Sequence, residues 1–179
     1  MNNNYWKKWY KEKHSLEPSD FAKFCLNLVR NKNVIDIGCG NGRDSYFLGQ
    51  YCKSLIGVDA NSLPEDKGNI KFIKKEIAEM IKKECEFDIV YSRFVLHAIK
   101  NKDIKKLVRW TDGMFIAECR AEKDVPIIYK KHKRTKANGE ELIRLLIDNG
   151  FKILYYKKAH GLAKYKEEDP LIIRIIAKK

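Results

Sequence analysis

The residues with the clearest chemistry lie in one run, Asn33-Val-Ile-Asp-Ile-Gly-Cys-Gly-Asn-Gly-Arg-Asp44. Glycine occupies every second position at Gly38, Gly40 and Gly42, so the backbone of this loop can approach a ligand closely. Asp36 stands two positions before the first glycine, where a carboxylate suits a cationic amino group better than a pyrophosphate. A dinucleotide-binding fingerprint also has its third glycine five positions after the first, one more than here. The run predicts a ligand-binding loop, with a glycine-rich turn without ligand as the alternative.

Two elements must position this loop. Val34–Ile37 is an apolar run too short for a helix and rich in branched residues, which is typical of a buried strand in a parallel sheet. Beyond the glycines, Tyr46, Phe47 and Leu48 open an amphipathic helical pattern. The start of a helix offers unpaired N–H groups and a positive dipole to a polar or negative ligand.

A second carboxylate, Asp59, ends the next predicted strand, Ser54–Asp59. In nucleoside-binding α/β sheets an acid about 20 residues beyond the glycine loop accepts hydrogen bonds from ribose hydroxyls. An ordinary helix N-cap is the alternative role for Asp59. Ile70–Lys74 is predicted as a third strand, and Glu76 follows it, where a first-turn helix acid would also be favourable.

A third group of polar residues follows a fourth predicted strand, Phe87–Tyr91. Ligands of open α/β sheets bind at the carboxyl ends of such strands, and Ser92, Arg93 and His97 lie just past this end. If a helix begins near Ser92, Arg93 and His97 are one turn apart and share a face.

The first run resembles motif I of the class I S-adenosylmethionine (SAM) dependent methyltransferases, apolar-apolar-D/E-apolar-G-x-G-x-G. The stretch Phe87-Asp-Ile-Val-Tyr-Ser-Arg-Phe-Val-Leu-His-Ala-Ile99 and the Gly40–Asp44 loop are similar to small bacterial methyltransferases associated with surface polysaccharide biosynthesis. The loop also resembles that of tellurite-resistance-type methyltransferases. The resemblance covers nearly the whole chain.

With the alternation of apolar runs and helical patterns, the resemblance implies an α/β fold. We expect a Rossmann-like, mostly parallel sheet of seven strands with an antiparallel last strand and helices on both faces. Helices are predicted at 102–110 and 140–149, and a fifth strand at 113–118. Strands at 151–156 and 171–177 should form an antiparallel edge. The insert 160–170 also resembles the bacterial group, and no role is assigned to it.

The resemblance implies SAM as cofactor and S-adenosylhomocysteine (SAH) as product. Glu76 and the backbone of Ile77 are the candidates for the adenine edge. The residues expected to bind the cofactor are Asp36, Gly38, Gly40, Asn41, Gly42, Arg43, Asp59, Ala60, Glu76, Ile77 and Ser92.

The acceptor must then be aligned with the methyl group, and an alcohol acceptor must also lose a proton. A histidine with a pKa near 6.5 suits that task, so His97 is the candidate general base, with a helix histidine satisfied by a neighbour as the alternative. Arg93 is predicted either to anchor an anionic acceptor by a forked contact or to orient Glu118 or the SAM carboxylate.

Further acceptor contacts are predicted at both ends of the chain. Glu118 and Arg120 end the fifth strand and either face the acceptor pocket or pair with each other. Residues 1–31 should form two helices, with Ser19 as an N-cap. They pack against the domain or cover the active site as a lid, with Tyr10 facing the acceptor. Arg134 lies in a basic run, 130–136, that binds phosphate or forms a solvated loop.

The composition limits the classes of function that fit this chain. The chain has 179 residues, about one domain (1–179), with five scattered cysteines and no C-x-x-C pair, which fits a reducing cytoplasm. No run is apolar enough to span a membrane and no signal peptide is evident. The net charge of +13 comes mostly from lysines in every segment, which favours a solvated surface over nucleic-acid binding.

We therefore expect a SAM-dependent methyltransferase that O-methylates a small polar metabolite, such as a sugar, nucleotide-sugar or phosphorylated glycan precursor. The alternatives are an RNA or other nucleic-acid methyltransferase and a non-catalytic SAM-binding partner protein. Tyr91-Ser-Arg-Phe94 lacks the N/D-P-P-Y/F motif of enzymes that methylate exocyclic base amines. It also lacks the acids with which catechol-type enzymes hold magnesium, so no metal is expected.

Overall fold

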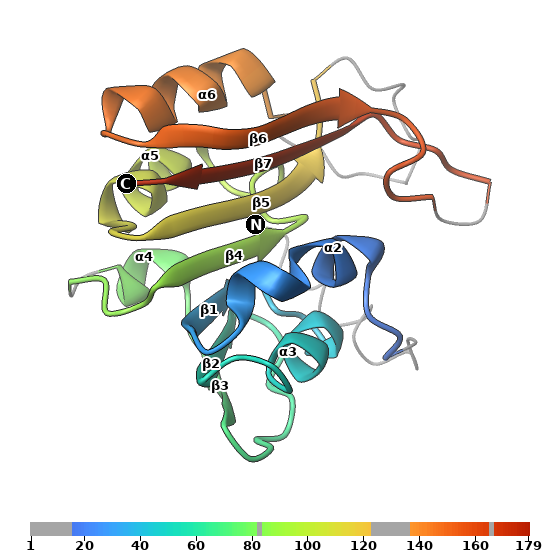
Figure 1. The fold of residues 1–179 in the computed structure, drawn as a ribbon, viewed down its shortest axis with the longest axis vertical. Coiled ribbons are helices and arrows are strands. Elements are labelled where there is room, and N and C mark those ends of the chain that lie inside the picture. Colours follow the sequence, from blue (N-terminus) through green and yellow to red (C-terminus); the bar gives the residue numbers. More distant parts are fainter. Residues whose placement is uncertain (1–15, 82–83, 123–136, 165–166) are drawn as a thin grey trace.

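A computed structural model describes residues 16–81, 84–122, 137–164 and 167–179. Seven strands form one sheet in the order β3-β2-β1-β4-β5-β7-β6 (Figure 1). The strands are β1 Asn33–Ile37, β2 Ser54–Asp59, β3 Ile70–Lys74, β4 Ile89–Arg93, β5 Met114–Arg120, β6 Lys152–Ala159 and β7 Ile172–Lys178. The helices are α2 Asp20–Val29, α3 Arg43–Leu48, α4 Ile77–Met80, α5 Asn101–Trp110 and α6 Gly139–Asp148.

The five strands β1 to β5 pair in parallel, whereas β7 runs antiparallel to both β5 and β6. Strand order reverses between β1 and β4, and open α/β sheets bind ligands at the carboxyl ends of strands near such a point. The predicted fold class is confirmed, including the antiparallel pair of strands at the end of the chain. The division into one domain, 1–179, stays a prediction.

Helices cover both faces of the sheet (Figure 1). On one face α2 and α3 bury Phe21, Cys25 and Leu48 against strand residues such as Tyr91. On the other face α5 and α6 bury Leu107, Leu146 and their neighbours. Alternate residues of a strand point to opposite faces, so each central strand contributes to both clusters. Among the described residues no helix is long and apolar enough to cross a membrane.

Local chemistry explains where the helices begin. Ser19 is the N-cap of α2, as predicted, and its side chain accepts a hydrogen bond from Ala22 N at 3.0 Å. Asn138 caps α6 in the same way by accepting from Glu140 N and Glu141 N. The helices predicted at 102–110 and 140–149 begin one residue earlier than expected, at Asn101 and Gly139.

The end of β4 differs from the prediction. The strand covers Ile89–Arg93 instead of 87–91, because β5 pairs with it as far as Arg93 opposite Glu118. Phe94 N then donates to Glu118 O at 2.7 Å and Phe94 takes a left-handed conformation with φ of 59°. No helix begins near Ser92. Ser92 and Arg93 therefore point to opposite faces of the sheet, and Arg93 and His97 do not share a helix face.

Candidate active site

The glycine loop connects β1 to α3 at the carboxyl edge of the sheet. Gly38, Gly40 and Gly42 all have positive φ, between 59° and 78°. Gly38 N donates to Val58 O at 2.7 Å, which ties the loop to the end of β2. A Cβ on Gly38 would lie 2.1 Å from Val95 Cγ2, so both conformation and space require glycine here.

Asp36 lies at this edge on the face that α2 and α3 cover, and only 2% of it is exposed. Ser45 Oγ, from α3, donates to Asp36 Oδ2 at 2.6 Å. Burial raises the pKa of the Asp36 carboxyl to about 7, the Ser45 hydrogen bond opposes this, and the negative charges of Asp44 and Asp59 add to it. A cation placed beside Asp36 would stabilise its charged form.

Asp59 ends β2, next to the glycine loop. Its Oδ2 accepts from Gly40 N at 3.2 Å, and its Oδ1 accepts from Asn61 N at 2.7 Å and from Ser62 N at 3.1 Å. Asp59 therefore caps the turn after β2 and also holds the loop expected to bind the cofactor. It is not a helix N-cap, the alternative role left open for it, since the described chain forms no helix between β2 and β3. Ala60 follows it within the same turn.

Two buried polar atoms near this edge have no hydrogen-bond partner among the described residues. They are Oδ1 of Asn61 and Oγ of Ser92. Buried polar groups are seldom left unsatisfied, because each costs about 1–3 kcal/mol, so such atoms mark places where a ligand or water belongs.

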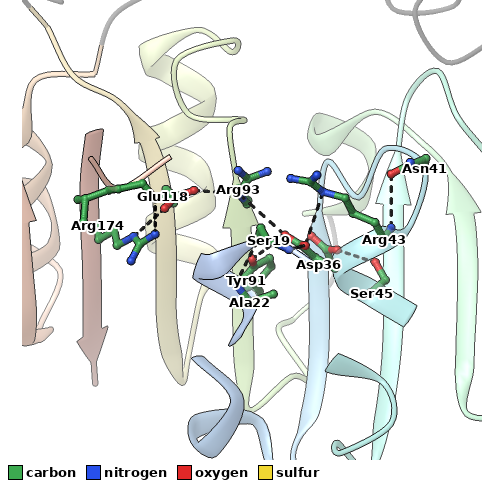
Figure 2. Close-up of polar contacts among 12 residues, drawn as sticks. Ser19, Ala22, Asp36, Asn41, Arg43, Ser45, Tyr91, Arg93, Glu118 and Arg174 are labelled. Carbon is green, nitrogen blue, oxygen red and sulfur yellow. Dashed lines mark hydrogen bonds and ion pairs between the residues drawn. The ribbon is translucent and has the colours of Figure 1, made fainter. Parts of the chain in front are cut away.

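A chain of buried charges crosses the ends of three strands (Figure 2). Arg93 Nε lies 2.8 Å from Glu118 Oε1, and Arg174 Nε lies 2.7 Å from Glu118 Oε2. Glu118 is fully buried, and the two arginine side chains are 16% and 9% exposed. Arg93 therefore orients Glu118, one of the roles that the sequence left open for Arg93. Arg174 was not predicted, because its sequence context is an unbroken apolar strand.

Asp44 is a second residue that sequence reasoning missed. Its carboxylate accepts from Ser19 N at 2.8 Å, Ser19 Oγ at 2.7 Å and Tyr91 Oη at 3.0 Å. Arg93 Nε is 4.0 Å from it and Arg43 Nε is 3.7 Å away. The only sequence signal for Asp44 was its place in the first turn of a short helix, where acids are common.

His97 lies in the turn after β4 and is 5% exposed. Its Nδ1 accepts a hydrogen bond from Arg120 N at 3.2 Å. A neutral ring that accepts at Nδ1 carries its proton on Nε2, so it has no second lone pair with which to accept a proton. This geometry favours hydrogen-bond donation by His97 and does not support the predicted general-base role.

Arg120 does not pair with Glu118, although it follows on the same strand. Arg120 Nη2 lies instead 2.9 Å from Glu168 Oε2, in the insert between β6 and β7. Pairing with each other was one of two alternatives for these strand-end residues, and the contacts of Glu118 with Arg93 and Arg174 take its place. That they face the acceptor pocket stays a prediction. The insert is thus attached to the edge of the sheet where the site residues gather.

The remaining candidates are placed as follows. Glu76 occupies the N-cap position of α4 without a side-chain cap hydrogen bond, and Ile77 is the first helical residue. Asn41 Oδ1 accepts from Arg43 N at 3.4 Å, within the glycine loop. Tyr10 and Arg134 lie outside the described residues, as does the part of the predicted lid that precedes residue 16.

A family model described as a methyltransferase domain matches residues 10–112. The chain belongs to the class I SAM-dependent methyltransferases. An uncharacterized methyltransferase, C70.08c of Schizosaccharomyces pombe, is 31% identical over 142 residues, which cover 68% of this chain and 54% of that protein. Phosphoethanolamine N-methyltransferase 3 of Arabidopsis thaliana is 26% identical over 146 residues, covering 70% of this chain and 30% of that protein. The chain thus spans about half of the length of the first of these relatives and less than a third of the second.

Solved structures support the same fold. TehB from Haemophilus influenzae superposes with a TM-score of 0.70 at 19% identity, over 99% of this chain and 66% of that one. A Burkholderia thailandensis 1,6-didemethyltoxoflavin-N1-methyltransferase, solved with bound SAH, has a TM-score of 0.69 at 18% identity, over 89% of this chain and 76% of that one. SAM is the cofactor of the family. No group of three or more His, Cys, Asp or Glu side chains in the described ranges could hold a metal ion, and the metal-free reaction stays a prediction.

Proposed function

We propose that this methyltransferase transfers the methyl group of SAM to a small polar acceptor. The observation that carries the proposal is the glycine loop flanked by two carboxylates, Asp36 and Asp59, at the carboxyl edge of neighbouring parallel strands. β1 and β2 pair with Asp36 opposite Gly57 and Ile37 opposite Val58, so Asp59 lies one residue beyond the end of β1. The positive φ of its three glycines lets the loop turn tightly across this edge, where its backbone can meet a ligand.

The polar groups at this edge match the parts of SAM. Asp36 is a buried carboxylate suited to the amino group, and Asp59 is an acceptor suited to the ribose hydroxyls. Glu76 and the backbone of Ile77, beyond β3, would face the adenine edge. Asn61 and Ser92 would supply polar atoms that lack a partner among the described residues. These assignments rest on the chemistry of the side chains and on their common edge of the sheet.

SAM supplies a methyl group that its sulfonium already activates, so the chain must chiefly bind and align the two reactants. Alignment alone can lower the barrier by about 7–11 kcal/mol when the reacting atoms are held in line. His97 would contribute as a hydrogen-bond donor from Nε2 to the acceptor, since its Nδ1 already accepts from Arg120 N. The role of general base in O-methylation is the sequence-based alternative for the same side chain.

The acceptor atom has two candidates. The sequence resemblance favours an oxygen atom of a sugar, nucleotide-sugar or phosphorylated glycan precursor. None of the relatives named above is linked by its name to polysaccharides. Nitrogen is the second candidate, because two plant relatives are named phosphoethanolamine N-methyltransferases. A nucleic-acid acceptor and a non-catalytic SAM-binding role are further alternatives. The cytoplasmic location also stays a prediction.

The test has two parts. First, SAH binding is measured by calorimetry for the wild type, Asp59→Asn and the control Asp112→Asn, whose side chain is 78% exposed. We expect Asp59→Asn to bind SAH about tenfold more weakly and the control to match the wild type. Second, radiolabelled SAM is added to fractionated lysate with and without nuclease. Label in a small-molecule fraction that survives nuclease supports the proposal, and label lost with nuclease contradicts it.

A further inference from the structure

We propose that the guanidinium groups of Arg43 and Arg93 together bind an anionic group, a phosphate or carboxylate, of the methyl acceptor. The inference rests on the proposed function, because it assigns a substrate class to the same site. Arg93 ends β4 and Arg43 begins α3, so both stand at the carboxyl edge of the sheet beside the predicted cofactor loop. Figure 2 shows both guanidinium groups at the same end of strands β1 and β4.

The hydrogen bonds of Arg93 leave its terminal amino groups available. Glu118 contacts Arg93 through Nε alone, at 2.8 Å. Within the part of the chain that the structure describes, neither terminal amino group of Arg93 has a hydrogen-bond acceptor. A guanidinium held at Nε keeps its fork of two amino groups fixed in direction, which is the arrangement that binds an oxyanion in two places.

Arg174 provides an internal contrast. It contacts the other oxygen of Glu118 through Nε, but its Nη2 also donates to Leu162 O at 2.8 Å. Its guanidinium carbon lies 5.3 Å and 5.7 Å from the ring centres of Phe21 and Phe24. Arg93 also lies against a ring, since its guanidinium carbon is 4.2 Å from the ring centre of Phe94. The two arginines differ in their terminal amino groups, because Arg174 Nη2 has an acceptor and those of Arg93 have none among the described residues.

Arg43 makes fewer polar contacts than Arg93 among the described residues. Its closest carboxylate oxygen among the described residues, Asp44 Oδ1, is 3.7 Å from Nε, beyond hydrogen-bond distance. The side chain is 32% exposed. Burial lowers the pKa of Arg43 from its ordinary value, and the positive charge of Arg93 lowers it further. The two arginines thus repel each other, and an anion between them would remove that repulsion.

The nearby acids do not provide this anion. Both oxygens of Glu118 are used by Arg93 and Arg174. The carboxylate of Asp44 already accepts hydrogen bonds from Ser19 and Tyr91. Asp36, whose charge also interacts with Arg93, is assigned above to the amino group of SAM. Three guanidinium groups therefore face two carboxylates that already have partners, an excess of one positive charge that suits a single phosphate or carboxylate. The carboxylate of SAM itself and free phosphate have the same chemistry, so the experiment must separate these sources from the acceptor.

The experiment titrates inorganic phosphate into the full chain by calorimetry, at constant ionic strength, with and without saturating SAH. The variants are Arg43→Gln, Arg93→Lys and the control Arg144→Gln, an exposed arginine on α6. Arg43→Gln is the informative change, because its guanidinium makes no hydrogen bond to any described residue and its loss should not disturb folding. Arg93→Lys keeps the charge beside Glu118 and removes the fork.

We expect the wild type to bind phosphate in the presence of SAH. Arg43→Gln should bind it about tenfold more weakly and Arg93→Lys severalfold more weakly, while Arg144→Gln is unchanged. All variants should bind SAH equally, because the proposal assigns Arg43 to the acceptor instead of to the cofactor, where the sequence had placed it. The proposal would be overturned if phosphate competed with SAH, or if Arg43→Gln lost SAH affinity tenfold. Either result would assign Arg43 and Arg93 to the carboxylate of the cofactor. The proposal would also be overturned if Arg43→Gln bound phosphate as tightly as the wild type does. The same holds if a wild type that binds SAH did not bind phosphate. Failure of the wild type to bind SAH contradicts the proposed function instead, and the titration without SAH still tests the anion site.

Discussion

Nε of Arg93 lies 2.8 Å from Oε1 of Glu118, a carboxylate that is fully buried and directly opposite Arg93 in the ladder between β4 and β5. The second oxygen of Glu118 contacts Arg174 on β7, across the antiparallel pair. One carboxylate thus connects three neighbouring strands of the sheet at the edge that carries the site.

Replacing this carboxylate should be costly. Glu118→Gln keeps the volume of the side chain but leaves two arginines, both less than one-fifth exposed, without a negative partner. Breaking a buried ion pair from one side costs about 3–5 kcal/mol, and urea unfolding should show a loss of this order. Glu168→Gln is the matched control, since its pair with Arg120 is 23% exposed on the acid side. It should cost less than about 1 kcal/mol, and equal effects of the two changes would contradict a buried network.

Asp36 should make the fold less stable as the pH rises. Its pKa is about 7 in the folded chain and 3.8 when unperturbed. Between these values the folded state binds more protons than the unfolded state, so the free energy of unfolding falls as the pH rises through this window. Asp36→Asn removes this contribution and should raise the free energy of unfolding at pH 8 by at least about 1 kcal/mol. Urea unfolding of both proteins at pH 5 and pH 8 measures it, and a difference independent of pH would contradict the assignment.

The same carboxyl should make cofactor binding depend on pH. If the SAM amino group binds beside Asp36, it favours the charged form and lowers the pKa of Asp36 in the complex. Binding then releases a proton below about pH 7, so SAH affinity should rise with pH up to about 7 and level off above it. Calorimetry in buffers of different ionisation enthalpy measures the proton release. Asp36→Asn should bind SAH more weakly and show no such pH dependence, and a wild type with flat affinity from pH 5 to 8 would exclude the contact.

The sequence predicted the scaffold well because its signals are local. Short branched runs at Val34–Ile37 and Ser54–Asp59 became strands, and Ser19 became the expected cap. The end of β4 was placed wrongly because it depends on pairing with β5, a partner far along the chain. Asp44 and Arg174 were missed for the same reason, since their roles come from residues 25 to 56 positions away.

Two causes require glycine at position 38, the lack of space for a Cβ and the positive φ, and variants can separate them. Gly38→Ala would bring a methyl group into Val95 Cγ2 and would also hold φ near +73°, which disfavours alanine. We expect a loss of stability of about 1–3 kcal/mol in thermal or urea unfolding, with weaker SAH binding. Val95→Ala in the same chain removes the clash but not the backbone strain, so the double variant should recover part of the SAH affinity. Full recovery would show that space alone requires glycine, and no recovery would show that Val95 is irrelevant.

The tautomer of His97 gives the most direct check on the chemistry. Because Nδ1 accepts from Arg120 N at 3.2 Å, the neutral ring should carry its proton on Nε2. Long-range proton–nitrogen NMR spectra at pH 8 distinguish the two ring nitrogens and identify the tautomer. His97→Asn retains an acceptor close to the position of Nδ1 and should keep the fold, whereas His97→Leu leaves Arg120 N without its partner and should destabilise the chain by about 1–3 kcal/mol. A proton found on Nδ1 would reverse this interpretation and restore Nε2 as a candidate base.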